Sequence, residues 1–119
     1  MSNVEDFHKR RTAGNEKILK EDFLPFKRFY GLDKLAYQES EISGKYKELM
    51  GLVASMALRC NDCISYHIEQ SIEAGATRGE LNEAMNIALV VGGSIVIPHL
   101  RHAFEVIEEL DKSKNSELI

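Results

Sequence analysis

The stretch from Ser43 to Leu58 is the feature that most constrains the fold of this chain. Apolar residues recur along it at helical spacing and also occupy the other sides, so the predicted helix is apolar nearly all round. Such a helix requires neighbours on every face, which places it in the middle of a helical bundle. Ser43 is a good N-cap for this helix. The apolar stripe consists of Tyr46, Leu49, Met50, Val53, Met56 and Ala57, and the other sides carry Leu52, Ala54 and Leu58.

Helical patterns continue through most of the remaining sequence. No other segment alternates convincingly, so the β-branched stretch from Val90 to Ile97 has no strand partner. We interpret it as the buried end of one helix, a break near Gly92 and Gly93, and the start of another. The other expected helices run over about residues 3–20, from Pro25 to about Tyr37, from Cys60 to Ala74, from the capping box at Thr77–Glu80 onward, and from Pro98 to Leu110, with a frayed tail after Asp111.

The predicted fold class is therefore all-α, a compact bundle of about five to six helices. The 119 residues suffice for one domain, residues 1–119, with N-terminal helices over 1–40 and a core over 41–110. Aromatic residues gather around Pro25, and we expect them to lie in the core or in a subunit contact. The methionines Met50, Met56 and Met85 are expected in the core.

The charge balance argues against a nucleic-acid partner. The chain carries 15 basic and 19 acidic residues, a net charge of -4. Its one basic cluster, His8–Arg11, is expected to be a solvated helix face. The sequence shows neither an apolar secretory segment at its start nor an apolar run of about 20 residues, so we expect no membrane association and a cytoplasmic location.

The segment from Cys60 to His67 carries the most specific chemistry. The two cysteines are three residues apart and His67 follows Cys63 by four, so all three share one face of a helix. Unpaired backbone N–H groups at the start of that helix favour a thiolate, the reactive form of cysteine. A histidine beside a thiol can act as its base.

Glu48 is the fourth member of this predicted site. It lies about 18 Å from Cys60 if the helix is unbroken, since each residue adds about 1.5 Å. If the chain reverses near Arg59, the two helices pair and Glu48 comes within about a turn of His67. A carboxylate bonded to the imidazole would fix its tautomer and raise its basicity.

These four residues resemble a known motif: glutamate, eleven residues, then Cys-x-x-Cys-x-x-x-His. It belongs to the alkylhydroperoxidase (AhpD-like) branch of the carboxymuconolactone decarboxylase family. The resemblance covers roughly Lys45 to Glu109. It implies an AhpD-like all-α fold, a homo-oligomer (trimer or hexamer), and a thiol-dependent peroxidase that needs no bound cofactor.

The same resemblance implies roles for the site residues. Cys63 would attack a small hydroperoxide, Cys60 would resolve it as a disulfide, and His67 and Glu48 would relay protons. An external dithiol or redox protein would restore the pair. One position departs from the motif: Asp62 stands where those enzymes carry histidine, and a carboxylate beside Cys63 disfavours its thiolate.

Other readings of the same residues stay open. The cysteines could be two buried small hydrophobic residues, or ligands of zinc together with His67 and either Asp62 or Glu48. Glu48 could instead pair with Lys45 on its helix surface. His99 and His102 could approach the site or merely pack. Functionally, the alternatives are a carboxymuconolactone decarboxylase-like enzyme, a general thiol–disulfide oxidoreductase, and a non-catalytic metal-binding oligomeric module.

Overall fold

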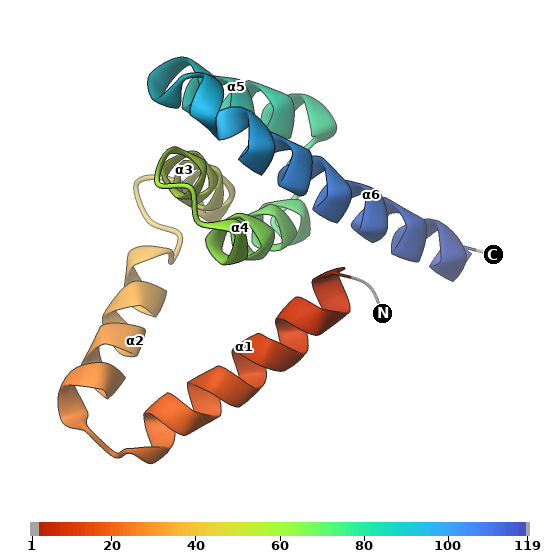
Figure 1. Cartoon of the computed structure of the whole chain (residues 1–119). Coiled ribbons are helices and arrows are strands. Elements are labelled where there is room, and N and C mark those ends of the chain that lie inside the picture. The colour runs from red at the N-terminus through yellow and green to blue at the C-terminus, as the bar shows by residue number, and fades with distance from the viewer. Residues whose placement is uncertain (1–2, 119) are drawn as a thin grey trace.

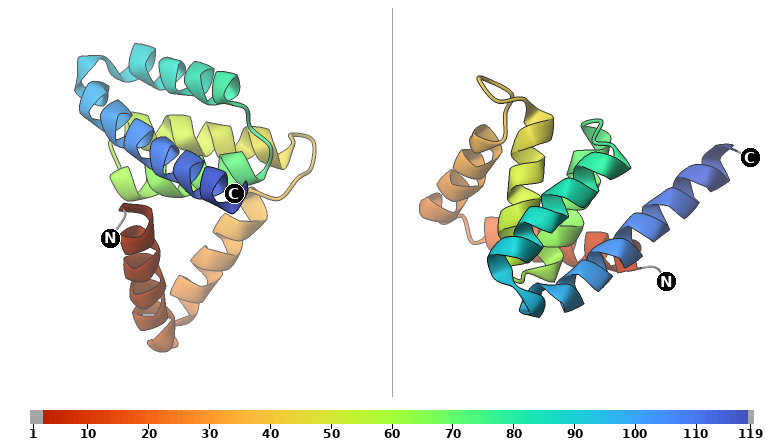
Figure 2. Two further views of the ribbon diagram at one scale, coloured as in Figure 1. Left: turned by 90° about the vertical axis from the view of Figure 1, so that its right-hand side faces the viewer. Right: turned by 90° about the horizontal axis from the view of Figure 1, so that it is seen from above.

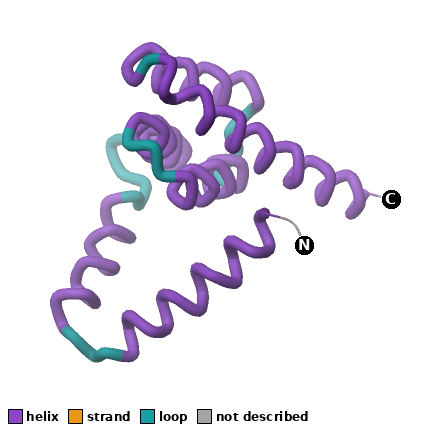
Figure 3. The backbone as a smooth tube through the Cα atoms, viewed as in Figure 1, coloured by secondary structure: helices purple, strands orange, loops and turns teal. Residues whose placement is uncertain are grey.

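The computed structural model describes the backbone of residues 3–118 and the side chains of residues 3–113. Within that part of the chain every regular element is helical, as Figure 3 shows. The all-α prediction is therefore confirmed. The helices are α1 (Asn3–Lys20), α2 (Leu24–Ala36), α3 (Gly44–Ala57), α4 (Asn61–Glu73), α5 (Arg78–Gly92) and α6 (Ile97–Leu118), with a short 3₁₀ helix, η1 (Ser94–Val96), between α5 and α6.

The hydrophobic core lies among α3, α4, α5 and α6. Helix α3 packs against both α4 and α5, and α6 crosses α4 (Figure 1). The prediction that α3 packs between other helices is thus confirmed, since α4 and α5 both contact it. The fully buried side chains include Leu52 and Met56 of α3, Ile64 and Ile68 of α4, Leu81, Met85 and Ala88 of α5, and Val96, Ala103, Val106 and Ile107.

The helix boundaries follow local signals that the sequence contains. The Ser43 hydroxyl accepts a hydrogen bond from the Tyr46 amide, and Thr77 and Glu80 form a complete capping box. Arg59 adopts a left-handed conformation with φ 61°, and the chain reverses there. Gly93, with φ 80°, separates α5 from η1. This reversal and this break both occur where the sequence predicted them.

Helices α1 and α2 form an arm that projects from the core as a V (Figure 2). The N-terminal end of α1 is tied to α6, because the Glu109 carboxylate accepts hydrogen bonds from the amides of Asn3 and Val4. The Tyr30 hydroxyl of α2 donates to Asn15 of α1 at 2.9 Å. Helix α2 buries none of its side chains in this chain.

Two burial predictions are wrong within the single chain, because Met50 is 54 % exposed and Val90 is 74 % exposed. Phe23, Phe26 and Phe29 around Pro25 are also exposed, so they do not lie in the core of this chain, and the subunit contact expected for them stays a prediction. Helix α3 is covered on two sides rather than on all of them, since the arm leads away from it. The helical conformation also continues past Asp111 to Leu118, where fraying was expected. No described helix is both long and apolar enough to cross a bilayer.

Candidate functional site

The two cysteines form a disulfide at the start of α4. Cys60 is the N-cap of the helix, and its sulfur accepts a hydrogen bond from the Cys63 amide at 3.3 Å. Cys63 is exposed, whereas Cys60 is half-buried. The pair therefore sits in the positive field of the helix start, and Cys63 is the more exposed of the two residues.

His67 and Glu48 are in direct contact. The His67 Nδ1 atom lies 2.9 Å from a Glu48 carboxylate oxygen, and both side chains are nearly buried, at 10 % and 12 % exposure. The reversal at Arg59 brings them together by pairing α3 with α4. The predicted hydrogen bond is confirmed. The surface pairing of Glu48 with Lys45 is not formed, because Lys45 pairs with Glu80 at 2.9 Å.

Tyr37, which sequence reasoning did not select, contacts the other side of His67. Its hydroxyl lies 3.4 Å from His67 Nε2, and the ring centroids are 5.2 Å apart. Gly51 of α3 faces both rings. A Cβ atom at Gly51 would lie 2.6 Å from His67 Cε1 and 2.7 Å from the Tyr37 oxygen, closer than real contacts allow. Glycine is required there by this close approach.

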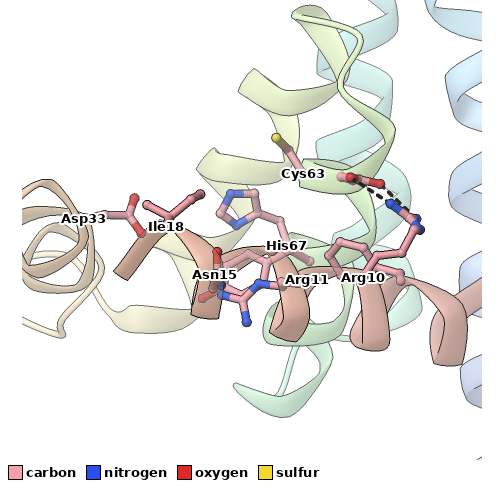
Figure 4. Close-up of a pocket in the computed structure, with 11 residues that line it drawn as sticks. Arg10, Arg11, Asn15, Ile18, Asp33, Cys63 and His67 are labelled. Carbon is pink, nitrogen blue, oxygen red and sulfur yellow. Dashed lines mark hydrogen bonds and ion pairs between the residues drawn. The ribbon is translucent and has the colours of Figure 1, made fainter. Parts of the chain in front are cut away.

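A pocket of about 390 Å³ opens beside Cys63 and His67 (Figure 4). One wall is α4, which contributes Tyr66 as well as these two residues. The opposite wall is the arm. Figure 4 shows the arm side chains facing the α4 residues across the pocket. The arm contributes Phe7, Arg10, Arg11, Gly14, Asn15 and Ile18 from α1 and Asp33 from α2.

Two arginines of the arm approach the α4 residues around the cysteines. The Arg10 guanidinium lies 3.3 and 3.4 Å from the two Asp62 oxygens, and it also contacts Asp6. These partners, Asp62 first, raise the pKa of Arg10. Arg11 stacks over the Tyr66 ring at 4.7 Å. The cluster His8–Arg11 is thus not merely solvated, because Arg10 offsets the charge of Asp62 next to Cys63.

The two histidines of α6 bind other residues. His99 Nδ1 is 2.7 Å from the Asn61 side-chain oxygen, and His102 Nε2 is 2.8 Å from the Ser65 hydroxyl. Both contacts join α6 to α4. Within the described residues, no group of three or more His, Cys, Asp or Glu side chains is arranged to hold a metal ion.

Sequence reasoning selected Cys60, Cys63, His67 and Glu48. The structure joins the two cysteines at the start of α4 and, about one turn further along this helix, joins His67 to Glu48 of α3. Sequence reasoning did not select Tyr37, Arg10 or Arg11. The sequence offered only a weak signal for Arg10, namely a cationic residue on a polar helix and a carboxylate at position 62 with no partner predicted for it. Spacing alone could not connect them, since they are 52 residues apart.

Comparisons with known proteins show relatives that share part of this sequence. An uncharacterized protein of Cupriavidus necator is 32 % identical over 65 residues, which cover 55 % of this chain and 58 % of that protein. An uncharacterized protein from the cox locus of Paracoccus denitrificans is 24 % identical over 83 residues, or 70 % and 75 % of the two chains. The chain thus spans less than two thirds of the first relative.

Solved structures match over nearly the whole chain. A crystal structure of a Thermotoga maritima protein has 49 % identity and a TM-score of 0.91, covering 94 % of this chain and 98 % of the other. A second structure of that protein, at 48 % identity and TM-score 0.90 over 94 % and 95 %, describes a carboxymuconolactone decarboxylase family protein for which a part in an antioxidative response has been suggested. A Legionella pneumophila member of that family reaches 28 % identity and TM-score 0.79 over 94 % and 97 %.

The family model agrees with these structures. Residues 25–109 match the carboxymuconolactone decarboxylase family, a range that includes α3, α4 and α5 as well as Tyr37. The match takes in all four residues of the Glu48–Cys60–Cys63–His67 motif. The chain is therefore a member of the carboxymuconolactone decarboxylase family.

Proposed function

We propose that this protein is a thiol-dependent peroxidase of the AhpD-like kind, which reduces small hydroperoxides through a dithiol–disulfide cycle. The observation that carries the proposal is the Cys60–Cys63 disulfide at a helix start, beside a nearly buried Glu48–His67 pair and a pocket. The antioxidative role suggested for the Thermotoga maritima relative supports the same chemistry.

In the proposed cycle, the Cys63 thiolate attacks the peroxide O–O bond. The S–O bond forms, the O–O bond breaks, and the alkoxide leaves as an alcohol after taking the proton that His67 received from the thiol. The Cys60 thiolate then attacks the sulfenic sulfur, and hydroxide leaves as water after protonation. The exposure of Cys63 and its place in the pocket wall favour it as the attacking sulfur.

An external dithiol completes the cycle by two exchange steps. Its first thiolate attacks the Cys63 sulfur and releases Cys60 as a thiolate, and its second thiolate then attacks the reductant's own sulfur in the mixed disulfide and releases Cys63. As the N-cap of α4, Cys60 receives the Cys63 amide N–H, which stabilises negative charge on that sulfur. We place the reaction in the cytoplasm, where dithiol reductants are abundant. The chemistry requires no bound cofactor.

The test follows the loss of an alkyl hydroperoxide in the presence of a dithiol reductant. Wild type turns over and Cys63→Ser does not. Without the reductant, Cys60→Ser consumes one peroxide per chain and forms no intrachain disulfide. Equal turnover by wild type and Cys63→Ser would overturn the proposal.

General thiol–disulfide exchange is a second candidate, favoured by the exposure of Cys63 at the start of α4. A reduction potential near that of thioredoxin-like couples, together with negligible peroxide loss, would support it over the peroxidase.

We also propose that the chain assembles with further copies of itself through α2, as a trimer or hexamer. Six large apolar side chains of this helix and its N-cap are 45–68 % exposed: Phe23, Leu24, Phe26, Phe29, Leu32 and Leu35. An apolar surface of this extent is unusual on a monomer and typical of an interface. No nucleic-acid partner is proposed, in keeping with the net charge of -4.

A further inference from the structure

We propose that Tyr37 is a positioning residue for His67, and that its hydroxyl holds the imidazole in the tautomer that can accept a thiol proton. The catalytic meaning of this role rests on the proposed peroxidase function. Tyr37 lies at the C-terminal end of α2, outside the Glu-Cys-Cys-His motif, and is half-buried against His67. Its hydroxyl is 3.4 Å from His67 Nε2.

The two partners of His67 divide its nitrogens. An ionised carboxylate only accepts hydrogen bonds, so Nδ1 must carry a proton to bond Glu48 at 2.9 Å. In the neutral ring Nε2 then holds the lone pair, and the Tyr37 hydroxyl donates to it. Burial, and then the charge of Glu48, raise the pKa of Tyr37. The phenol therefore remains a donor at neutral pH and above.

A hydroxyl suits this position because it can reverse its role. When the imidazole takes the proton of a thiol, Nε2 becomes a donor, and the same Tyr37 oxygen can then accept from it. A carboxylate or an ammonium group could serve only one of the two states. At 3.4 Å the contact is long, as hydrogen bonds of catalytic groups often are before substrate binds.

Gly51 provides a second, independent observation. A side chain at this position of α3 would collide with both His67 and the Tyr37 hydroxyl. The structure thus leaves a space on α3 that is filled by these two rings together. The tilt of 36° between the rings, with centroids 5.2 Å apart, adds an aromatic contact that fixes Tyr37 in place.

The experiment uses Tyr37→Phe, which keeps the ring and removes only the hydroxyl. The matched control is Tyr46→Phe, since the Tyr46 side chain is 50 % exposed on α3 and its ring contacts Lys45. Both are placed in a Cys60→Ser background, where serine preserves the N-cap and Cys63 is the single thiol. Two quantities are measured: the ¹⁵N chemical shifts of the His67 ring, and the rate of Cys63 alkylation as a function of pH.

We expect the control to show a neutral His67 protonated at Nδ1 with a hydrogen-bonded Nε2. In Tyr37→Phe, the Nε2 resonance moves toward that of an unbonded nitrogen. Alkylation of Cys63 near pH 7 slows about fivefold, and its half-maximum moves to higher pH. The reason is that the imidazolium loses a charge-assisted hydrogen bond, which is stronger than the bond that the neutral ring loses.

Identical ring shifts and identical alkylation profiles in Tyr37→Phe and the control would overturn the inference. Neither measurement uses a peroxide, so the two proposals can fail separately. A wild type that consumes no hydroperoxide, with a Tyr37→Phe effect present, supports Tyr37 as a positioning residue and overturns only the peroxidase. Peroxide turnover by wild type with no effect of Tyr37→Phe would support the peroxidase and overturn only the role of Tyr37.

Discussion

The core helices and the N-terminal arm use apolar residues in opposite ways. Helix α4 buries five of its thirteen residues, among them Ile64 and Ile68, whereas α2, of equal length, buries none. The core is therefore stabilised by packing within one chain, whereas the apolar side chains of α2 remain exposed on the surface of that chain. The pocket lies where the two meet, so one wall belongs to α4 of the core and the other to the arm. The reactive residues are thus positioned by core packing, whereas the opposite wall comes from an arm whose second helix has no buried side chain.

The largest expected difference between the regions concerns stability. Ile68→Ala should lower the free energy of unfolding by about 2–5 kcal/mol, because it leaves a cavity in the core. Leu32→Ala should cost little at low protein concentration, and its cost should grow with concentration, because the proposed assembly would bury that side chain. Denaturant unfolding over a range of concentrations measures both. A Leu32→Ala effect independent of concentration would contradict the contrast.

The assembly surface can be tested directly at Phe29, which is 68 % exposed on α2. Phe29→Glu places a charge in the proposed contact and should dissociate the oligomer, since an unpaired charge is costly to bury. Thr12→Glu, at an exposed position on α1, is the control that should assemble normally. Sedimentation velocity reports the species. An unchanged oligomer in Phe29→Glu would exclude this face.

A smaller effect is expected where the arm supplies charge to the core. Arg10→Ala should slow Cys63 alkylation about two- to fivefold, because the Asp62 carboxylate is then no longer offset. The rate is measured in the Cys60→Ser background at neutral pH. Arg10→Ala combined with Asp62→Asn should return it close to wild type, as coupled residues do in a double-mutant cycle. Additive losses would show that Arg10 acts by another route.

The smallest effect lies within the core itself, at the start of α5. The Thr77 backbone N–H, and then Lys45, lower the pKa of Glu80. A carboxylate with a lowered folded pKa stabilises the protein above its unfolded pKa, and this contribution is lost as the pH falls through the folded value. Glu80→Gln should therefore make stability less dependent on pH between about 5 and 3. The exposed Glu83→Gln is the control, and equal pH profiles for the two would refute the assignment.

Local signals and a motif were enough to predict much of this molecule. Ser43, the Thr77–Glu80 capping box and the break at Gly92–Gly93 are short-range features, so the sequence shows them directly. The Glu48–His67 contact followed once a reversal near Arg59 was assumed. Tyr37 and Arg10 could not be found this way, because helical spacing relates residues on one helix or on paired helices. Their contacts depend on how the arm returns to α4.

Exposure was the least predictable property for a related reason. The apolar periodicity of α2 and of the end of α5 predicts that these faces are buried. It does not indicate whether the same chain or another copy buries them. Val91 is 73 % exposed and Leu35 is 61 % exposed. The pattern is therefore compatible with burial inside one bundle or between several. Only the three-dimensional arrangement of the helices shows that these faces are not buried within the single chain.

The sulfur of Cys60 has two partners in this structure, the Cys63 sulfur and the Cys63 amide. Opening the bridge therefore also changes the acceptor that the first turn of α4 relies on. The rate of hydrogen–deuterium exchange at the Cys63 amide should consequently differ between the oxidised and the reduced protein. Exchange at this single amide would then report the redox state of the cysteine pair.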